Sequence, residues 1–271
     1  MNSKLNAARA VNQEVLRCEL EGVGISADNL SLFTYDLIGS TNKEALDWGE
    51  KNDTGAALFI AERQSAGRGR LGRSFLSPEG GLYMSFLIRP SSAARDTASI
   101  TAKCAIAVSR AVEALTGLDC KIKWVNDIYV DGRKLAGILT QGRTREDGGL
   151  DFAVIGIGIN LKACDLGEEL KSIATSTEEA GGGVPDRCTL AAAIVREIFS
   201  ILDDSLKDEI LEEYRHRSIL AGKSVRVIMP ADEYTARVLG IDEGFRLILE
   251  REGEVIHLST GEVSVRADLT K

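Results

Sequence analysis

The sequence predicts an α+β protein in which an antiparallel sheet with helices is followed by a small barrel. Asp-Gly turns at Gly132 and Gly148 join successive strand-like segments, and tight turns between strands produce antiparallel pairing. Those segments are 121–130, 134–142 and 151–160. Further on, short strand-like runs repeat within about 50 residues, which is typical of a small barrel. They are 223–229, 233–241, 245–250, 254–258 and 261–266.

The segment before the first predicted strand is short. Residues 4–21 carry apolar side chains at helical spacing until Gly22 and Gly24 break the pattern, and 28–38 is predicted to form a strand. A winged-helix DNA-binding domain needs about 60 residues, which is more than this segment offers. We therefore expect a helical lead-in over 1–30 and no DNA-binding domain.

A helix and two strands are predicted around a loop rich in glycine and arginine. Thr41 with Glu44 three positions later has the spacing of a capping box, which predicts a helix from Thr41 to about Glu50. Pro90 ends the second of the two strands. The three segments after this helix are a strand at 56–62, the loop at 65–74 and a strand at 82–89.

Two longer helices complete the predicted fold. The first covers 100–115, where the period and the alanine content are those of a buried helix that Gly117 closes. The second is an amphipathic helix over 189–218. The change to short strands after it places a domain boundary there, with a main domain over 31–218 and a barrel over 219–271.

Composition limits the classes of function. The chain has 271 residues, of which 44% are hydrophobic and 27% charged, and such values argue against disorder. The formal net charge of -8 disfavours nonspecific binding to nucleic acid or to an anionic membrane. No apolar run reaches the roughly 18 residues that span a bilayer, and no signal peptide is evident, so we expect a cytoplasmic protein without a membrane partner.

Cysteine and histidine offer few groups for chemistry. The five cysteines are widely spread and form no C-x-x-C pair, so neither a disulfide framework nor a zinc site is predicted. We expect reduced, buried thiols. The two histidines are His216 and His257, which leaves little for a histidine general base. An enzyme of this composition is expected to act by positioning and by charge.

The loop at 65–74 contains the G-x-G-x-x-G pattern of dinucleotide sites. A dinucleotide site needs a helix after the third glycine, whereas this segment continues through Pro78 into a strand, so we reject that interpretation. Glycines that alternate with Arg68, Arg70 and Arg73 instead suit the capture of a carboxylate or a phosphate. A solvated hairpin, or a segment that touches nucleic acid, explains the loop equally well.

A second group of polar residues follows the predicted strand on which Lys123 and Val125 share a face. The side-chain oxygens of Asn126 and Asp127 suit a hard cation such as Mg2+. Lys134 offers a point charge for a phosphoryl oxygen. A hairpin with charged edges and a buried tryptophan explains the same residues, so both interpretations stay open.

A third feature is the apolar strand at 154–160. Gly156 and Gly158 are two positions apart, so both lie on one face of the strand and leave that face without side chains. A bare face of this kind suits a flat apolar ligand. It equally suits a neighbouring helix that packs closely against the strand.

Five segments in this order resemble the biotin protein ligase family, over about residues 31–271. They are Ser40-Thr41-Asn42, Glu62 to Arg73, Lys123 to Asp127, Arg133 to Leu139 and Gly156 to Asn160. The resemblance implies a class II aminoacyl-tRNA synthetase/biotin synthetase-like catalytic domain with a central mixed sheet, plus a small SH3-like β-barrel. It also implies the monofunctional type, which lacks an N-terminal DNA-binding domain. Val125 stands where the family usually has proline.

The resemblance implies an enzyme that uses ATP to form biotinyl-5'-AMP and transfers biotin to a lysine of the biotin carboxyl carrier domain of a carboxylase. Mg2+ is expected to be carried mainly by ATP, without a dedicated protein cage.

The implied catalytic residues are Lys134 and Arg70. The implied biotin-binding residues are Ser40, Thr41, Asn42, Gln64, Gly67, Arg68, Gly69, Arg70, Lys134, Gly137, Gly156 and Gly158. Those implied near ATP and Mg2+ are Arg68, Arg73, Lys123, Trp124, Asn126, Asp127 and Asn160.

Two alternatives from other classes remain. A lipoate protein ligase shares the fold, although the Gly-Arg-Gly-Arg loop and the Lys-Leu-Ala-Gly-Ile run favour biotin. A non-catalytic biotin-responsive regulator would bind DNA, which the net charge of -8 disfavours. A homodimer through an exposed sheet edge is compatible with the expected fold, but the sequence does not identify that edge.

Overall fold

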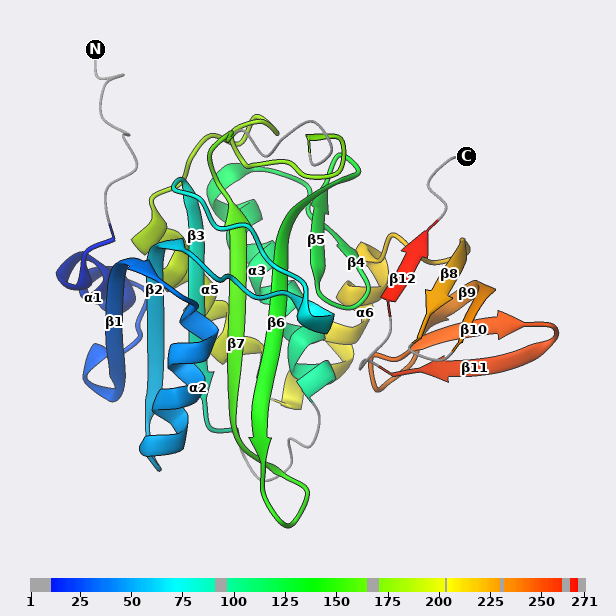
Figure 1. Ribbon diagram of the computed structural model, residues 1–271, viewed down its shortest axis with the longest axis horizontal. Coiled ribbons are helices and arrows are strands. Elements are labelled where there is room, and N and C mark those ends of the chain that lie inside the picture. Colours follow the sequence, from blue (N-terminus) through cyan, green and yellow to red (C-terminus); the bar gives the residue numbers. More distant parts are fainter. Residues whose placement is uncertain are drawn as a thin grey trace.

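Figure 1 shows the computed structural model, in which a large sheet with helices lies beside a small sheet near the C-terminus. The structure describes residues 11–90, 97–164, 171–202, 204–229, 232–259 and 264–267. The start of the predicted lead-in helix lies outside the described residues.

The large sheet has seven strands in the order β1-β2-β3-β7-β6-β5-β4. Their bounds are β1 (Leu30–Ile38), β2 (Ala56–Gln64), β3 (Gly81–Ile88), β4 (Lys121–Lys123), β5 (Asp127–Val130), β6 (Arg133–Thr144) and β7 (Leu150–Asn160). β1 and β2 are parallel and the other neighbouring strands are antiparallel, so the expected mixed sheet is confirmed. Asp131 and Gly132 both have positive φ in the turn between β5 and β6, as the tight turn requires.

Helices cover both faces of the large sheet (Figure 1). They are α1 (Gln13–Gly22), α2 (Thr41–Lys51), α3 (Thr97–Thr116), α5 (Arg187–Ile201) and α6 (Lys207–Arg217). Side chains alternate across a strand, so β2 sends Leu58 and Ile60 into the main core and Ala57 and Phe59 into a smaller core with α2. Burial on both faces explains why the strand is continuously apolar. No helix in the described part of the chain is long and apolar enough to cross a membrane.

The small sheet has five antiparallel strands in the order β11-β10-β9-β8-β12. Their bounds are β8 (Ser224–Ile228), β9 (Glu233–Ile241), β10 (Leu247–Arg251), β11 (Glu254–Leu258) and β12 (Ser264–Ala267). Alternate residues such as Val225 and Val227 are buried between the strands. The expected α+β architecture with a small C-terminal barrel is therefore confirmed.

The two sheets meet at the bend between β4 and β5. Trp124 Nε1 donates a hydrogen bond to Phe245 O at 2.9 Å, and Tyr214 Oη donates to Val125 O at 3.1 Å. The rings of Tyr214 and Phe245 pack edge to face. Burial raises the pKa of Tyr214, which keeps its hydroxyl protonated as the donor. The small sheet therefore supports the backbone that leads to Asn126.

The prediction of a single strand over 121–130 is wrong. β4 ends at Lys123, the Trp124–Val125 peptide bond is cis, and β5 begins at Asp127 and pairs back onto β4. Val125 therefore does not share a strand face with Lys123. Its side chain is 1% exposed in the main core. Contacts with α6, which is remote in the sequence, stabilise a bend in a segment whose apolar pattern favours a continuous strand.

The single helix predicted over 189–218 is also wrong. The segment forms α5 and α6, with a short 3-10 helix, Asp204–Leu206, between them. Aspartate and serine side chains compete with the helical backbone for hydrogen bonds, and a cluster of them at this point favours an interruption. The two shorter helices then pack against α3 at different points.

The cysteines follow the prediction only in part. All five are free, and Cys104, Cys120 and Cys188 are buried. Burial raises the pKa of Cys104 and of Cys120 to about 12, which makes these thiols poor nucleophiles. Cys18 is exposed and Cys164 is half-buried, so the expectation of five buried thiols is wrong.

Candidate functional site

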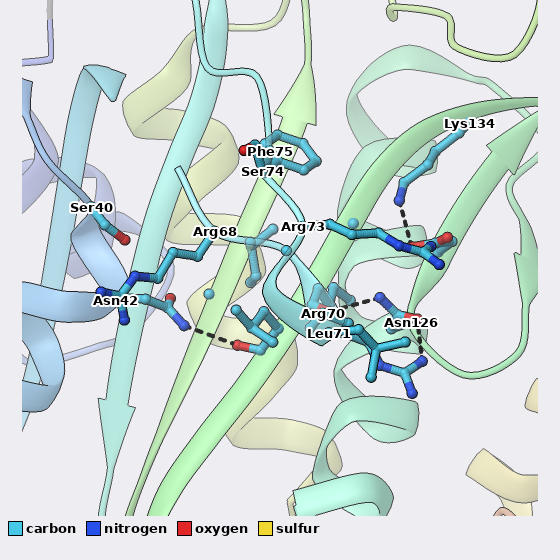
Figure 2. Close-up of a pocket in the computed structure, with 18 of the residues that line it drawn as sticks. Ser40, Asn42, Arg68, Arg70, Leu71, Arg73, Ser74, Phe75, Asn126 and Lys134 are labelled. Atoms are coloured by element: carbon cyan, nitrogen blue, oxygen red, sulfur yellow. Dashed lines mark hydrogen bonds and ion pairs between the residues drawn. The ribbon is translucent and has the colours of Figure 1, made fainter. Parts of the chain in front are cut away.

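A pocket with a volume of about 310 Å³ lies over the middle strands of the large sheet, where the loop between β2 and β3 crosses them (Figure 2). This pocket is lined by most of the residues that the sequence predicts for the site. They are Ser40, Thr41, Asn42, Gln64, Arg68, Gly69, Arg70, Arg73, Lys123, Trp124, Asn126, Asp127, Lys134, Gly137, Gly156 and Gly158. Residues from all five segments of the resemblance therefore meet in one cavity.

Two predicted site residues, Gly67 and Asn160, lie outside the lining. A Cβ atom at Gly67 would lie 2.3 Å from Phe75 O, so glycine lets the two sides of the loop approach. Asn160 Nδ2 donates to Thr175 O at 3.0 Å. Both residues support the backbone around the pocket.

The N-terminus of α2 supplies uncharged polar groups to one end of the pocket. Ser40 is the N-cap residue and its side chain makes no capping hydrogen bond, so the capping box predicted from Thr41 and Glu44 is wrong. The backbone N–H of Thr41 instead donates to Gln64 Oε1 at 2.8 Å. This bond identifies the oxygen of the Gln64 amide, and its Nε2 donates to Ser77 Oγ at 2.9 Å. Ser40 and Thr41 line the pocket, whereas Glu44 does not.

The glycine face of β7 and β6 is covered by other side chains. A Cβ atom at Gly156 would lie 1.9 Å from Asn42 Oδ1, and one at Gly158 would lie 2.4 Å from the Phe75 ring. A Cβ atom at Gly137 would lie 3.4 Å from the same ring. All three glycines line the pocket, but the face is not an open slot, because Asn42 and Phe75 lie against it.

Replacing Gly156 with alanine is expected to displace Asn42 from its position at the start of α2. Overpacking of a buried site costs about 1–3 kcal/mol, so urea unfolding should show a free energy of unfolding lower by about 2 kcal/mol. Gly240→Ala is the control, because an added Cβ in β9 meets nothing within 4 Å. It should change that free energy by less than about 0.5 kcal/mol. Equal losses in the two variants would contradict the steric account.

The other end of the pocket carries cations beside a carboxylate. Lys134 Nζ lies 2.7 Å from Asp127 Oδ1, and Arg70 Nη1 donates to Asn126 Oδ1 at 3.0 Å (Figure 2). Asn126 Nδ2 donates in turn to Ile138 O at 3.0 Å, which orients the amide oxygen toward Arg70. Burial lowers the pKa of Arg70, and the negative charge of Asp127 opposes that shift. The bend after β4 thus anchors the arginine-rich loop.

The remaining cations divide between the two ends. Figure 2 shows Arg73 on the side of Lys134, whereas Arg68 lies on the side of α2, beside Asn42. Lys123 Nζ lies 5.8 Å from the centre of the Tyr129 ring. Burial raises the pKa of Tyr129 to about 12, so its hydroxyl is neutral at pH 7. Arg70, Arg73, Lys123 and Lys134 therefore lie at one end of the pocket, and Arg68 is apart from the other two arginines of the loop.

Several lining residues were not predicted from the sequence. They are Leu71, Ser74, Phe75, Met84, Tyr129, Ile138, Leu139 and Ile157. Tyr129 follows Asp127 by two positions on β5, and that spacing on a strand places both side chains on one face. Phe75 directly follows the predicted loop. The spacing of Tyr129 from Asp127 could therefore have identified Tyr129 as a lining residue, whereas the apolar lining residues cannot be told from core residues by their sequence.

Oxygen ligands for a metal are few at this site. Of the described residues that line the pocket, Asp127 is the one carboxylate. No three His, Cys, Asp or Glu side chains gather as a metal site within the described residues. Mg2+ commonly binds through one or two carboxylates together with substrate phosphates and water. Asp127 therefore fits a Mg2+ ion that enters with a polyphosphate.

Comparisons with known proteins agree with this geometry. The model of the biotin/lipoate A/B protein ligase family matches residues 35–160, and that of the biotin protein ligase C terminal domain matches 221–266. The chain is 33% identical over 245 residues to the bifunctional ligase/repressor BirA of Escherichia coli, covering 89% of this chain and 75% of that protein. It is 30% identical over 262 residues to the biotin--[acetyl-CoA-carboxylase] ligase of Mycobacterium tuberculosis, covering 93% of this chain and 95% of that protein.

A solved structure shares the whole architecture. The biotin protein ligase from Aquifex aeolicus in complex with biotin and ATP has a TM-score of 0.76 and 28% sequence identity, covering 88% of this chain and 99% of that chain. The matched segments include the strands and loops that form the pocket, together with the small sheet. The chain therefore belongs to the biotin protein ligase family.

Proposed function

We propose that this chain is an ATP-dependent biotin protein ligase. It forms biotinyl-5'-AMP and transfers the biotinyl group to a lysine of the biotin carboxyl carrier domain of a carboxylase. The observation that carries the proposal is the polarity of the pocket, which has hydroxyl and amide groups with a single cation, Arg68, at the α2 end and four cations at the β4–β6 end. Biotin has the same polarity, with a ureido ring at one end and a carboxylate at the other.

The α2 end suits the ureido ring. A cyclic urea offers N–H donors and a carbonyl acceptor, and Thr41, Gln64 and Ser40 offer hydroxyl and amide groups that complement both. Met84, Leu139 and Phe75 line the pocket as well, and their apolar surface suits the bicyclic ring and the alkyl chain of biotin. We assign head-group binding to the polar residues and packing to the apolar ones.

The cationic end suits the first chemical step. A biotin carboxylate oxygen attacks the α-phosphorus of ATP, the bond from that phosphorus to the bridging oxygen breaks, and pyrophosphate leaves. The carboxylate is already ionised at pH 7, so this step needs no general base. Lys134 supplies a positive charge where the carboxylate and the α-phosphate meet, and Asp127 holds its ammonium group in place at 2.7 Å. Fixed charges of this kind stabilise the charge that develops in the transition state.

The second step joins biotin to the acceptor. The lysine amine attacks the acyl carbon of biotinyl-5'-AMP, the bond from that carbon to the phosphate oxygen breaks, and an amide and AMP result, with loss of a proton from the amine. Before this attack the acyl adenylate must be kept from water. Arg70, anchored to Asn126, holds the loop over the pocket for that purpose.

ATP and Mg2+ are assigned to the cationic end. Arg73, Lys123 and Asn126 lie there with Asp127, and Mg2+ would neutralise phosphate charge with Asp127 as its protein ligand. Trp124 shapes the same end, and Asn160 acts through the backbone of Thr175. The homodimer stays a prediction. The outer strands of the large sheet are β1 and β4, and Ile122 of β4 already accepts a hydrogen bond from Ile219 N–H, so β1 is the edge assigned to it.

Lipoate is the alternative substrate. Its dithiolane ring has no N–H donor and no carbonyl, so it offers no hydrogen-bond partner to the buried hydroxyls of Ser40 and Thr41, and an unmatched buried polar group costs about 1–3 kcal/mol. The ureido ring satisfies them. The α2 end of the pocket therefore favours biotin.

Transfer to a carrier domain tests the proposal. The purified chain, ATP and Mg2+ are incubated with a biotin carboxyl carrier domain and either biotin or lipoate, and the carrier is weighed by mass spectrometry. We expect one biotinyl addition, none with lipoate, and none on a carrier whose acceptor lysine is replaced by arginine. Lipoylation in place of biotinylation would assign the chain to the alternative substrate.

A further inference from the structure

A buried serine lies behind the α2 end of the pocket. Ser85 has an exposed fraction of 0% and interrupts the otherwise largely apolar strand β3. Its neighbour on β7 is Gly156, which lines the pocket. A buried hydroxyl must be satisfied by hydrogen bonds to offset its desolvation, so the partners of Ser85 indicate its purpose.

The partners of Ser85 are Asn42 and Thr41. Ser85 Oγ lies 2.6 Å from Asn42 Oδ1 and 2.8 Å from Thr41 Oγ1. The amide nitrogen of Asn42 is directed elsewhere, because its two protons point to Leu139 O at 3.3 Å and to Gln141 Oε1 at 3.1 Å. The amide oxygen can only accept. The single proton of Ser85 is therefore donated to Asn42.

This assignment determines the proton of Thr41. With the Ser85 proton on Asn42, the contact of 2.8 Å between the two hydroxyls is made by Thr41 donating to Ser85 Oγ. The other neighbour of the Thr41 hydroxyl is Gln64 Oε1, which lies farther away at 3.1 Å and also accepts the Thr41 backbone N–H at 2.8 Å. The proton therefore goes to the shorter contact, because two hydroxyl oxygens at 2.8 Å need a proton between them. The proton of Thr41 thus points away from the pocket, and the lone pairs of Oγ1 are left for a ligand.

We propose that Ser85 is a positioning and specificity-determining residue: it holds the Thr41 hydroxyl as a hydrogen-bond acceptor toward the pocket, and so selects a ligand that presents an N–H group there. The proposal rests on the function assigned above, in which that ligand is biotin and the N–H belongs to its ureido ring. Without Ser85 the Thr41 proton loses its nearest acceptor and keeps only the longer contact of 3.1 Å with Gln64 Oε1, so the hydroxyl can donate to a ligand as well as accept from it.

Steady-state kinetics of biotin-dependent pyrophosphate exchange test the proposal with Ser85→Ala. The KM for biotin should rise about tenfold, the effect of one misdirected hydrogen bond, while kcat and the KM for ATP stay within about twofold. Ser109→Ala is the matched control, because Ser109 has the same exposed fraction of 0% but donates to Ala105 O inside α3. Its kinetic constants should match those of the wild type.

A double-mutant cycle separates this role from a loss of packing. Thr41→Val keeps the shape of the side chain and removes the hydroxyl through which Ser85 is proposed to act. In that background Ser85→Ala should raise the KM for biotin by less than about twofold. An equal increase in both backgrounds would overturn the proposal, as would an unchanged KM for biotin in the single variant.

Biotin analogues test the selection itself. In the two cyclic carbamates, oxygen replaces one or the other ureido N–H, so one of them presents an acceptor to Thr41. The wild type should discriminate against that analogue, and Ser85→Ala should reduce the discrimination about tenfold, because the freed Thr41 hydroxyl can then donate to it. Unchanged discrimination against both analogues would refute the selection.

If the wild type showed no biotin-dependent exchange, the proposed function would fail first, whereas an active wild type with an unaffected Ser85→Ala variant would refute this inference alone.

Discussion

Replacing Lys134 with alanine should lower the rate of biotin adenylation by about 100-fold or more, the loss typical of removing one preorganised charge donor. The ammonium group of Lys134 lies at the end of the pocket assigned to the carboxylate and the α-phosphate, and Asp127 holds it at 2.7 Å. Its removal leaves the negative charge that develops between those groups without a fixed partner. Asp127 also loses its counter-ion, which adds repulsion toward phosphate.

The measurement is pyrophosphate exchange by Lys134→Ala at saturating biotin and ATP. The matched control is Lys121→Ala, since Lys121 lies nearby on β4 and pairs with Asp119 at 2.8 Å, but is not among the residues that line the pocket. The control should keep the wild-type rate. Near-normal exchange by Lys134→Ala would remove this lysine from the catalytic assignment.

Replacing Arg70 with glycine should release the intermediate. Arg70 links the loop to Asn126 at 3.0 Å, and this contact helps to anchor the loop beside the bend after β4. A loop that is no longer anchored opens more often and admits water and foreign amines. We expect free biotinyl-5'-AMP in solution and biotinylation of lysines on a bystander protein, at about ten times the wild-type level, which corresponds to about 1.4 kcal/mol of lost loop closure.

This prediction is tested by chromatography of the nucleotides and by blotting a bystander such as serum albumin for biotin. Arg145→Gly is the control, because Arg145 lies in another loop, between β6 and β7, and pairs with Asp147. It should retain the intermediate as the wild type does. Retention by Arg70→Gly as well would show that the loop is closed by other contacts.

Local sequence signals were sufficient for much of the fold. The turn between β5 and β6 is set by Asp131 and Gly132, whose backbone preferences act within the turn itself. The bend after β4 was not predicted, because Asn126 and Asp127, whose types are common in turns, were interpreted as candidate ligand-binding residues within a strand over 121–130. The bend depends on Tyr214 and Phe245, which are distant in sequence and meet it only in the folded chain.

The candidate site shows the same limit. Residues such as Lys134 and Gln64 were predicted because they belong to polar or glycine-rich segments that resemble a family. Phe75 and Ser85 were not predicted, because their roles at the site depend on residues that are distant in sequence. Phe75 lies over Gly158, and Ser85 contacts Asn42 at 2.6 Å. A serine within a buried strand is nevertheless a usable signal, since a buried hydroxyl requires a partner.

The activation of biotin by ATP is the central claim, and the exchange of labelled pyrophosphate into ATP tests it most directly. The assay uses the purified chain with Mg2+, and biotin, lipoate or no acid. We predict exchange that requires biotin and is absent with lipoate and without an acid. Exchange with lipoate alone, or no exchange with either acid in a folded sample, would contradict the assignment of this pocket as a site that forms biotinyl-5'-AMP.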